Sequence, residues 1–419
     1  GERLDGHDFV RQAFLRGAVA AIVSREVLSS QVQRKSLILV DDTLKALADL
    51  AAYHRSRFKK LLVVGVTGTN GKTTVKDMTA LCLSRKYKTL KTEGNLNNHI
   101  GAPLTLLRLN ESHQAAVIEM GMSSPGEIAA LSKIARPSIG VITNIGPAHL
   151  KGLKTVAGVR KAKSELLEYL SGRGKIVLNA DDLNSRPLIN RRRKNIVTFG
   201  KEASADINLV DTWSNGKIGH FAVIQSGIKE QEIHVPLSGK HNVQNALAAC
   251  AVSVMAGVKM EDFAKSLKKI RPAPMRMEPV TAPNKTRIIN DAYNANPDSV
   301  EAALTCLAGC RRDKGGRLLF VFGDMLELGA VSVSAHKKIA GAVKKAGVDH
   351  IFALGEMASI TAREAVRLGV GATIRKSHIS IARALARGLK AQDTILVKGS
   401  RGTEMERVVD NLMEILKGE

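Results

Sequence analysis

A glycine-rich loop near the start of the chain contains the parts of a phosphate-binding site. Residues 65–74 read GVTGTNGKTT and directly follow the apolar residues 61–64. Small residues let backbone N–H groups turn toward an anion, a lysine reaches the terminal phosphates, and a hydroxyl serves Mg²⁺. The required types are all present: Gly68, Gly71, Lys72 and Thr73. Since the usual spacing puts a glycine where Val66 stands, we interpret the segment as a phosphate loop of unusual spacing rather than a plain glycine turn.

Two more groups follow apolar runs that we read as strands. Glu119 comes directly after residues 115–118, and a carboxylate there, in the same sheet as Lys72, is placed to hold Mg²⁺ against the phosphates. The alternative is a surface charge at a strand end. His149 follows residues 139–143 in the segment NIGPAHL and is either a metal ligand or an ordinary loop histidine.

Local chemistry leaves two other candidates open. Lys163 lies in the helical stretch KAKSELLEYL, where a lysine usually faces solvent, so the residue type by itself assigns it no role. Asn245 lies in GKHNVQNALAA, at the entry to a helix, and either reads an adenine edge or satisfies the turn.

Strand-like runs alternate with helical patterns along the whole chain, which predicts an α/β protein with largely parallel sheets. The stretch 271–279, RPAPMRMEP, has three prolines in nine residues and is typical of a linker. We therefore predict a small α/β N-terminal domain at 1–58, which the family resemblance given below implies to be partial, a central phosphate-loop domain at 59–272 and a C-terminal Rossmann-like domain at 273–419. The predicted strands are 20–23 and 37–40 in the first domain; 61–64, 115–120, 139–144, 175–179 and 195–199 in the second; and 287–290, 318–322, 350–354 and 394–397 in the third.

Composition excludes several classes of protein. With 419 residues, 44% hydrophobic, the chain is expected to form two or three globular domains. No run approaches the roughly 18 apolar residues of a membrane span, and the N-terminal GERLDGHDF is not a secretory signal, so we predict a cytoplasmic protein without a transmembrane segment. The four cysteines lack metal-ligand spacing and are expected to be reduced.

The net charge of +24 favours anionic partners. The basic residues are dispersed, however, and aromatic residues make up 3% of the chain, so platforms for stacking bases are scarce. We predict a solvated basic surface that helps attract anionic substrates, with no specific nucleic-acid binding.

Nine motifs occur in order along the chain: TGTNGKTT, GNLNNHIGAPLTLL, IEMGMSSPGEIAAL, ARPSIGVITNIGPAHL, AKSELL, GKHNVQNALAA, NDAYNANPDSV, GDMLELG and VKGSRG. Together they resemble the Mur ligases, and among them the ligases that add D-alanyl-D-alanine to UDP-N-acetylmuramoyl-tripeptide. The resemblance implies a three-domain architecture, ATP, two Mg²⁺ ions, those two substrates and a monomer.

The resemblance also implies residue roles. ATP is expected to contact Gly68, Thr69, Asn70, Gly71, Lys72, Thr73, Thr74, Asn245, Arg276 and Asp291. Thr73 and Glu119 are expected to ligate one Mg²⁺, and His149 and Lys163, the latter as a carbamate, the other. Lys72, Glu119, His149 and Lys163 form the expected catalytic set. The nucleotide sugar is expected at Asn95, Asn97 and Asn98, and the dipeptide at Tyr293, Asn294, Asn296, Asp298, Lys398, Ser400 and Arg401. The last two could instead be a helix start and a surface charge.

In such ligases the substrate carboxylate attacks the γ-phosphate, and the incoming amine then displaces phosphate from the acyl phosphate. This reaction needs cations more than a nucleophilic side chain. The loop begins at residue 65, which departs from the family pattern: we expect a shortened N-terminal domain without the family's Asp-Ser-Arg segment, which helps bind uridine, and the departure concerns uridine-nucleotide affinity. The rival interpretations are a ligase adding lysine or a diamino acid, a folate polyglutamate ligase, and a catalytically silent ATP-binding protein.

Overall fold

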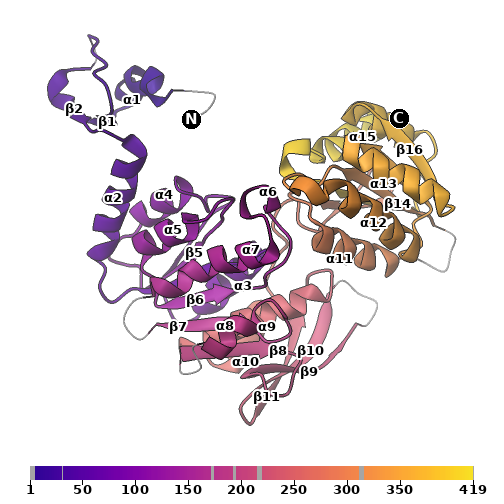
Figure 1. Ribbon diagram of the computed structural model, residues 1–419, viewed down its shortest axis with the longest axis horizontal. Helices are drawn as coiled ribbons and strands as arrows, with labels where there is room; N and C mark the ends of the chain where they lie inside the picture. Colours follow the sequence, from indigo (N-terminus) through magenta and orange to yellow (C-terminus); the bar gives the residue numbers. More distant parts are fainter. Residues whose placement is uncertain are drawn as a thin grey trace.

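The computed structural model describes residues 5–30, 32–170, 174–191, 195–214, 219–310 and 316–418. Within them, three sheets of two, nine and six strands follow one another along the chain (Figure 1). Helices alternate with the strands, so the predicted α/β class is confirmed. No helix among the described residues has the length and apolar character needed to cross a bilayer.

The first unit is small and stands apart from the rest, at the far end of α2 (Figure 1). Its core consists of three buried valines, Val10, Val23 and Val32. Asp42 caps α2 through the backbone N–H groups of residues 44 and 45, and α2 then packs on α4 and α5 of the second unit. The elements are η1 (Gly6–Phe9), α1 (Val10–Leu15), β1 (Ala21–Val23), η2 (Arg34–Ser36), β2 (Leu37–Leu39) and α2 (Thr43–Ser56).

The nine-stranded sheet has the order β11-β10-β9-β8-β7-β6-β3-β5-β4 and is parallel from β9 to β4. Its strands are β3 (Leu62–Thr67), β4 (Thr89–Lys91), β5 (Ala115–Glu119), β6 (Ile139–Ile142), β7 (Lys175–Asn179), β8 (Ile196–Gly200), β9 (Ile207–Trp213), β10 (His220–Ser226) and β11 (Lys229–Val235). The helices are α3 (Lys72–Leu83), α4 (Gly101–Leu107), α5 (Glu127–Ala135), α6 (Leu150–Leu153), α7 (Val156–Ser164), η3 (Glu165–Glu168), α8 (Arg186–Arg191), α9 (His241–Met255) and α10 (Met260–Leu267).

Both faces of this sheet are covered, which explains the continuous apolar runs of its central strands. On β3, Val63 belongs to the core on one face, whereas Val64 and Val66 belong to the core on the other. Helices α3, α9 and α10 pack together over the second face, and α2, α4 and α5 over the first. The phosphate loop therefore begins at the end of β3, a central strand that is packed on both faces.

The six-stranded sheet has the order β12-β13-β17-β14-β15-β16, in which β12 is antiparallel to its neighbour and the other pairs are parallel. The elements are β12 (Glu278–Thr281), β13 (Arg287–Asp291), α11 (Pro297–Ala308), β14 (Leu318–Gly323), η5 (Gly329–Val331), α12 (Ser332–Lys345), β15 (His350–Leu354), α13 (Glu356–Arg367), β16 (Gly371–Arg375), α14 (His378–Ala386), β17 (Thr394–Lys398), η6 (Arg401–Thr403) and α15 (Glu406–Gly418). The linker predicted at 271–279 ends two residues early, because its last two residues already pair in β12.

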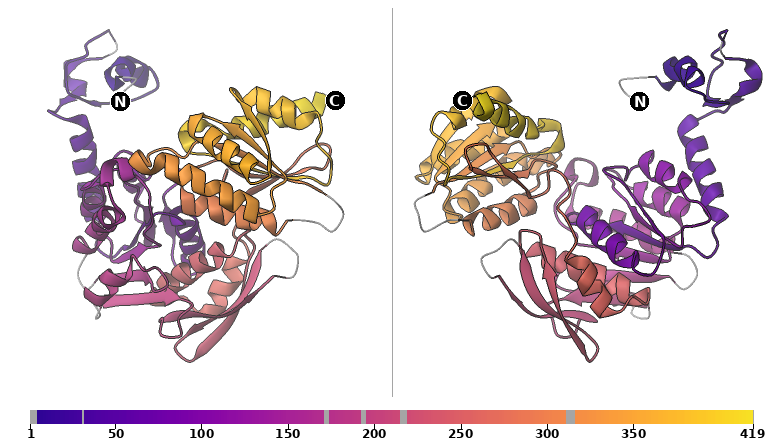
Figure 2. Two further views of the ribbon diagram at one scale, coloured as in Figure 1. Left: turned by 45° about the vertical axis from the view of Figure 1, so that its right-hand side comes forward. Right: turned by 180° about the vertical axis from the view of Figure 1, so that it is seen from behind.

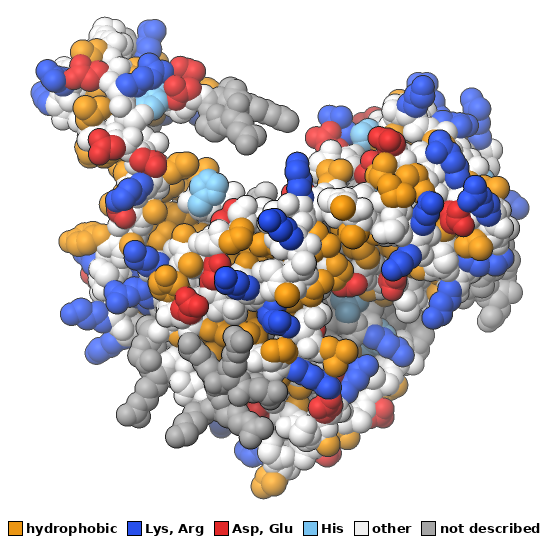
Figure 3. All heavy atoms as spheres, in the orientation of Figure 1, with side chains coloured by type: hydrophobic (Ala, Val, Ile, Leu, Met, Phe, Trp, Pro, Cys, Tyr) orange, Lys and Arg blue, Asp and Glu red, His pale blue; other side chains and the backbone are white. Residues whose placement is uncertain are grey.

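The third unit lies beside the second (Figure 2), and α6 contacts η5 at this junction. Lys and Arg side chains are scattered over the face shown in Figure 3 rather than gathered in one patch. The domain boundaries at 58/59 and 272/273 remain predictions, although the three sheets fall on separate sides of them.

Candidate active site

The phosphate loop joins β3 to α3 and needs glycine at two positions. Gly71 has φ +80°, and a Cβ there would lie 2.3 Å from Asn245 Oδ1. A Cβ on Gly68 would lie 1.8 Å from Thr143 Oγ1. Both clashes are far inside van der Waals contact, so the loop can approach β6 and α9 this closely because side chains are missing there.

The loop backbone is fixed by the segment after β6. Thr143 Oγ1 and Asn144 Nδ2 donate to the carbonyl oxygen of Asn70 at 2.6 and 3.0 Å. The N–H of Asn70 donates to Asn144 Oδ1 at 2.9 Å, and the N–H of Thr69 to the Asn144 carbonyl at 2.9 Å. The loop is thus held in shape by its own protein contacts, which lowers the ordering cost of binding an anion.

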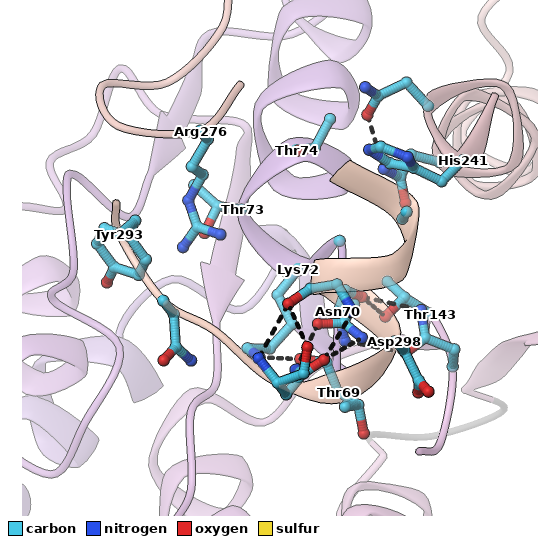
Figure 4. A pocket seen from close by; sticks show the side chains of 18 of the residues that line it. Thr69, Asn70, Lys72, Thr73, Thr74, Thr143, His241, Arg276, Tyr293 and Asp298 are labelled. Carbon is cyan, nitrogen blue, oxygen red and sulfur yellow. Dashed lines mark hydrogen bonds between the residues drawn. The ribbon is translucent and has the colours of Figure 1, made fainter. Parts of the chain in front are cut away.

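Lys72 opens α3 and folds over the loop (Figure 4). Its Nζ donates to the carbonyl oxygens of Gly68 at 2.9 Å and Thr69 at 3.0 Å. Burial lowers the pKa of Lys72 to about 8, and the charge of Arg276 acts in the same direction against the attraction of Glu119. Phosphate groups in this position would restore the cation.

Glu119 ends β5 inside the protein, 1% exposed. Its Oε1 accepts a hydrogen bond from Asn97 Nδ2 at 2.8 Å, while Oε2 is buried and has no partner among the described residues. Thr73, also buried, stands in the first turn of α3. Glu119 and Thr73 both line the same pocket, and a free carboxylate oxygen and a hydroxyl are hard oxygen ligands that Mg²⁺ takes, so these residues fit the predicted metal.

The residues expected around a second metal, His149 and Lys163, do not present a free carboxylate oxygen as Glu119 does. His149 Nδ1 pairs at 2.5 Å with Oε2 of Glu327, a residue of the loop before η5. Lys163 is buried on α7, with 2% of its surface exposed. Burial, and then the charge of Lys72, set the pKa of Lys163 well below its usual range. Among the described residues, no three His, Cys, Asp or Glu side chains are grouped to hold a metal ion.

The third unit closes over the loop and completes a pocket of about 1130 Å³. The guanidinium of Arg276, from the linker, lies 3.9 Å from the ring centroid of Tyr293 (Figure 4). Lys398 Nζ donates to Asp291 Oδ2 at 2.5 Å and to the Asn294 carbonyl at 3.0 Å. One wall of the pocket therefore comes from a different unit than the loop it faces, and it carries the cations Arg276 and Lys398.

Residues 66–253 match the model of the Mur ligase middle domain, and residues 275–401 match that of the Mur ligase glutamate ligase domain. The chain belongs to the Mur ligase family. The resemblance seen in the motifs, and the three-domain α/β architecture that it implies, are confirmed.

Two relatives of this Mur ligase are UDP-N-acetylmuramoyl-tripeptide--D-alanyl-D-alanine ligases. That of Bacillus subtilis is 38% identical and that of Escherichia coli 37% identical, each over 99% of this chain and 89% of the relative. A crystal structure of MurF from Acinetobacter baumannii matches with a TM-score of 0.89 at 33% identity, over 99% of this chain and 89% of that one. MurF from Thermotoga maritima in complex with ADP matches with a TM-score of 0.84 at 28% identity, over 100% and 93%.

Most of the predicted site residues of this Mur ligase share the pocket. Those that line it are Thr69, Asn70, Gly71, Lys72, Thr73, Thr74, Asn97, Asn98, Glu119, His149, Asn245, Arg276, Asp291, Tyr293, Asn294, Asn296, Asp298 and Lys398. Those outside its lining are Gly68, Asn95, Lys163, Ser400 and Arg401. Gly68 and Lys163 still adjoin it, because Lys72 contacts the first and its charge acts on the second.

Ser400 and Arg401 make structural contacts. Ser400 Oγ donates to the Ala295 carbonyl and accepts from the Leu326 N–H, and it does not cap η6. Arg401 pairs with Glu406 and contacts the sulfur of Met275. Their assignment to the dipeptide stays a prediction that these contacts do not favour.

Sequence reasoning missed a polar wall after β7. Asp182 Oδ2 accepts from the Ile145 N–H at 2.7 Å and so holds the loop that carries His149. Gln244 Nε2 donates to Asp181 Oδ2 at 2.6 Å, and both residues line the pocket. The sequence did contain an indication of this wall: Asp181 and Asp182 follow the predicted strand 175–179, at the carboxyl edge of the sheet, where ligands bind.

Proposed function

We propose that this chain is an ATP-dependent ligase that joins D-alanyl-D-alanine to UDP-N-acetylmuramoyl-tripeptide, a step of peptidoglycan precursor synthesis. The observation that carries the proposal is 38% and 37% identity, over 99% of the chain, to two ligases of that name. The pocket supports it, because a phosphate loop, a carboxylate with a free oxygen and a wall from a second unit are brought together there.

The proposed first step transfers the γ-phosphoryl group of ATP to the terminal carboxylate of the tripeptide. This step brings the negative charges of the ATP phosphates and the substrate carboxylate together. Lys72 on the loop and Arg276 from the linker supply positive charge that stabilises them. Mg²⁺, held by Thr73 and Glu119, would neutralise charge on the phosphates. Asn97 orients Glu119 through its hydrogen bond and leaves the other oxygen free.

A carbamate on Lys163 and a second Mg²⁺ at His149 are finer parts of the proposal. Carbon dioxide adds to a neutral amine with release of a proton, and the lowered pKa of Lys163 favours the neutral form. The product would be a buried anion near the cation of Lys72, so its charge would be compensated. Because His149 Nδ1 pairs with Glu327, the other ring nitrogen, Nε2, would have to bind the metal.

In the proposed second step the amine of the dipeptide attacks the acyl phosphate and phosphate leaves. The residues we assign to the dipeptide are Tyr293, Asn294, Asn296, Asp298 and Lys398, on the side of the third unit. Asp298 stands in the first turn of α11. Burial, and then the charges of Glu301 and Asp182, raise its pKa, so a neighbouring ammonium group would be stabilising there. Asn95, Asn97 and Asn98 are assigned to the nucleotide sugar.

Phosphate release by the purified protein tests the proposal. With ATP, Mg²⁺ and UDP-N-acetylmuramoyl-tripeptide present, we expect release that depends on D-alanyl-D-alanine. Indifference to the dipeptide, with a response to lysine or to a diamino acid instead, would show that the chain is another Mur-type ligase. ATP binding without release under any of these conditions would indicate a catalytically silent protein.

A cytoplasmic location and a monomer belong to the same proposal. ATP as phosphoryl donor and four free cysteines suit a reducing, ATP-containing compartment. Gel filtration with light scattering at the concentration of the assay tests the monomer.

A further inference from the structure

The tip of the phosphate loop touches the third unit through a pair of side-chain amides. Asn296 Nδ2 donates to Asn70 Oδ1 at 2.8 Å, and Asn70 Nδ2 donates to Asn296 Oδ1 at 3.4 Å. The two residues lie 226 positions apart in the chain. Asn296 is 7% exposed and Asn70 is partly buried, and both line the pocket, so this contact is partly shielded from water.

Each partner is tied firmly into its own unit. The backbone N–H and carbonyl of Asn70 are bonded to the segment after β6, and the described hydrogen bonds of its side chain go to Asn296. Asn296 is the N-cap of α11 and forms a capping box with Ser299. Because the amide pair links the N-cap of α11 directly to the phosphate loop, a displacement of α11 would displace the loop or break the pair.

A second close approach lies beside the amide pair. A Cβ on Gly146 would lie 2.5 Å from Asp298 Oδ2, so the first turn of α11 rests against the loop after β6. The backbone of Gly146 in turn exchanges hydrogen bonds with Thr69 Oγ1. The N-terminus of α11 thus contacts the phosphate loop directly and through its supporting segment.

We propose that Asn70 and Asn296 are positioning residues that make docking of the third unit part of the nucleotide site. Docked α11 holds the loop in its anion-binding shape, and a bound nucleotide, by fixing the loop, favours docking in return. Such a coupling is reciprocal by thermodynamic necessity. The inference needs ATP or ADP binding at the loop and does not depend on which amine the enzyme accepts.

A double-mutant cycle tests the coupling. Asn296→Ser keeps an N-cap residue but is too short to reach Asn70, and Asn70→Ala removes the other amide while the loop backbone contacts stay. We expect each variant to bind ADP with Mg²⁺ about fivefold more weakly than the wild type by calorimetry, and the double variant to be no weaker than either single one. Small-angle X-ray scattering with ADP should show all three variants less compact than the wild type.

The matched control is Ser299→Ala. This change removes the other half of the capping box, the bond from the Asn296 N–H to Ser299 Oγ at 3.0 Å, and leaves the amide pair in place. Its ADP affinity should equal that of the wild type. An equal loss in Ser299→Ala would overturn the proposal by making the effect one of helix capping. Losses that add in the double variant would overturn it too, since Asn70 would then act on the nucleotide alone.

Discussion

The protonation state of Lys72 should control nucleotide binding above neutral pH. Burial lowers the pKa of Lys72 to about 8 in the free protein, and bound phosphates would raise it again. Binding then takes up a proton at high pH, and affinity falls as the pH rises through 8. We expect ADP to bind about tenfold more weakly at pH 9 than at pH 7.

Calorimetry in two buffers of different ionisation enthalpy measures this uptake. Nearly one proton per ADP is expected at pH 9 and almost none at pH 7. Lys72→Met should bind weakly at both pH values and show no uptake. Uptake that persists in this variant would assign the proton to another group.

Lys163 should matter as an anion rather than as a cation. Lys163→Ala should lower turnover by about 100-fold, the loss seen when a metal site loses a supporting ligand, and formate or acetate should restore part of it. Lys161→Ala on the same helix, where the side chain is exposed, should leave turnover unchanged. Wild-type protein in ¹³C-bicarbonate should show a carbamate signal that Lys163→Ala lacks. Full activity of Lys163→Ala would remove this residue from the mechanism.

At the scale of elements, the loop between β3 and α3 can be tested against a matched helix start. Gly71 and Gly126 both precede a helix with left-handed φ, +80° and +87°. A Cβ on Gly71 meets Asn245 at 2.3 Å, whereas one on Gly126 meets nothing within 4 Å. Gly126→Ala should lose about 1 kcal/mol of unfolding free energy to backbone strain, and Gly71→Ala should lose more, because its Cβ also meets Asn245.

Nucleotide binding should separate these two variants. Gly71→Ala must push Asn245 or the loop aside, so we expect ADP affinity to fall at least about tenfold, while Gly126→Ala binds as the wild type does. Thermal melts with and without ADP measure both quantities together. Equal ADP stabilisation of the two variants would mean that the close approach of Gly71 to Asn245 has no part in binding.

Burial determines which strands can be predicted from the sequence. The central strands β3, β5 and β6 are covered on both faces and so read as apolar runs. Strands β9 to β11, at the sheet edge, alternate half-exposed polar residues such as Asn208 and Gln225 with apolar ones, and they were missed. β4 and β16 were missed as well; β4 has three residues, and β16 is a largely exposed edge strand. Local chemistry found the loop, Lys72 and Glu119, whereas the role proposed for Lys163 came from the family resemblance alone.

At the scale of the whole molecule, contacts between units were beyond sequence reasoning. The pairs Asn70 with Asn296 and His149 with Glu327 join segments 226 and 178 positions apart. Each residue is polar and lies in a loop or at a helix start, so no periodicity marks it. The motif GDMLELG was noticed, but a role for Glu327 required the two units to be seen side by side.

The pair of His149 and Glu327 should contribute weakly to docking of the third unit. The hydrogen bond from His149 lowers the pKa of Glu327. The stabilisation is thus present above the usual pKa of a glutamate, and it is lost as the pH falls through the lowered value of the docked state. Because the Glu327 side chain is 53% exposed, the pair is screened and contributes at most about 1 kcal/mol.

Glu327→Gln should therefore shift the ratio of docked to undocked molecules by no more than about fivefold at neutral pH. Small-angle X-ray scattering over a salt series measures this shift, and added salt should move the wild type toward the variant. Glu202→Gln is the control, since it breaks an ion pair of similar exposure, with Arg186, inside the second unit. A larger expansion in Glu327→Gln would mean that this pair, rather than the amides at the loop tip, dominates docking. No difference between Glu327→Gln and Glu202→Gln would remove the pair from docking.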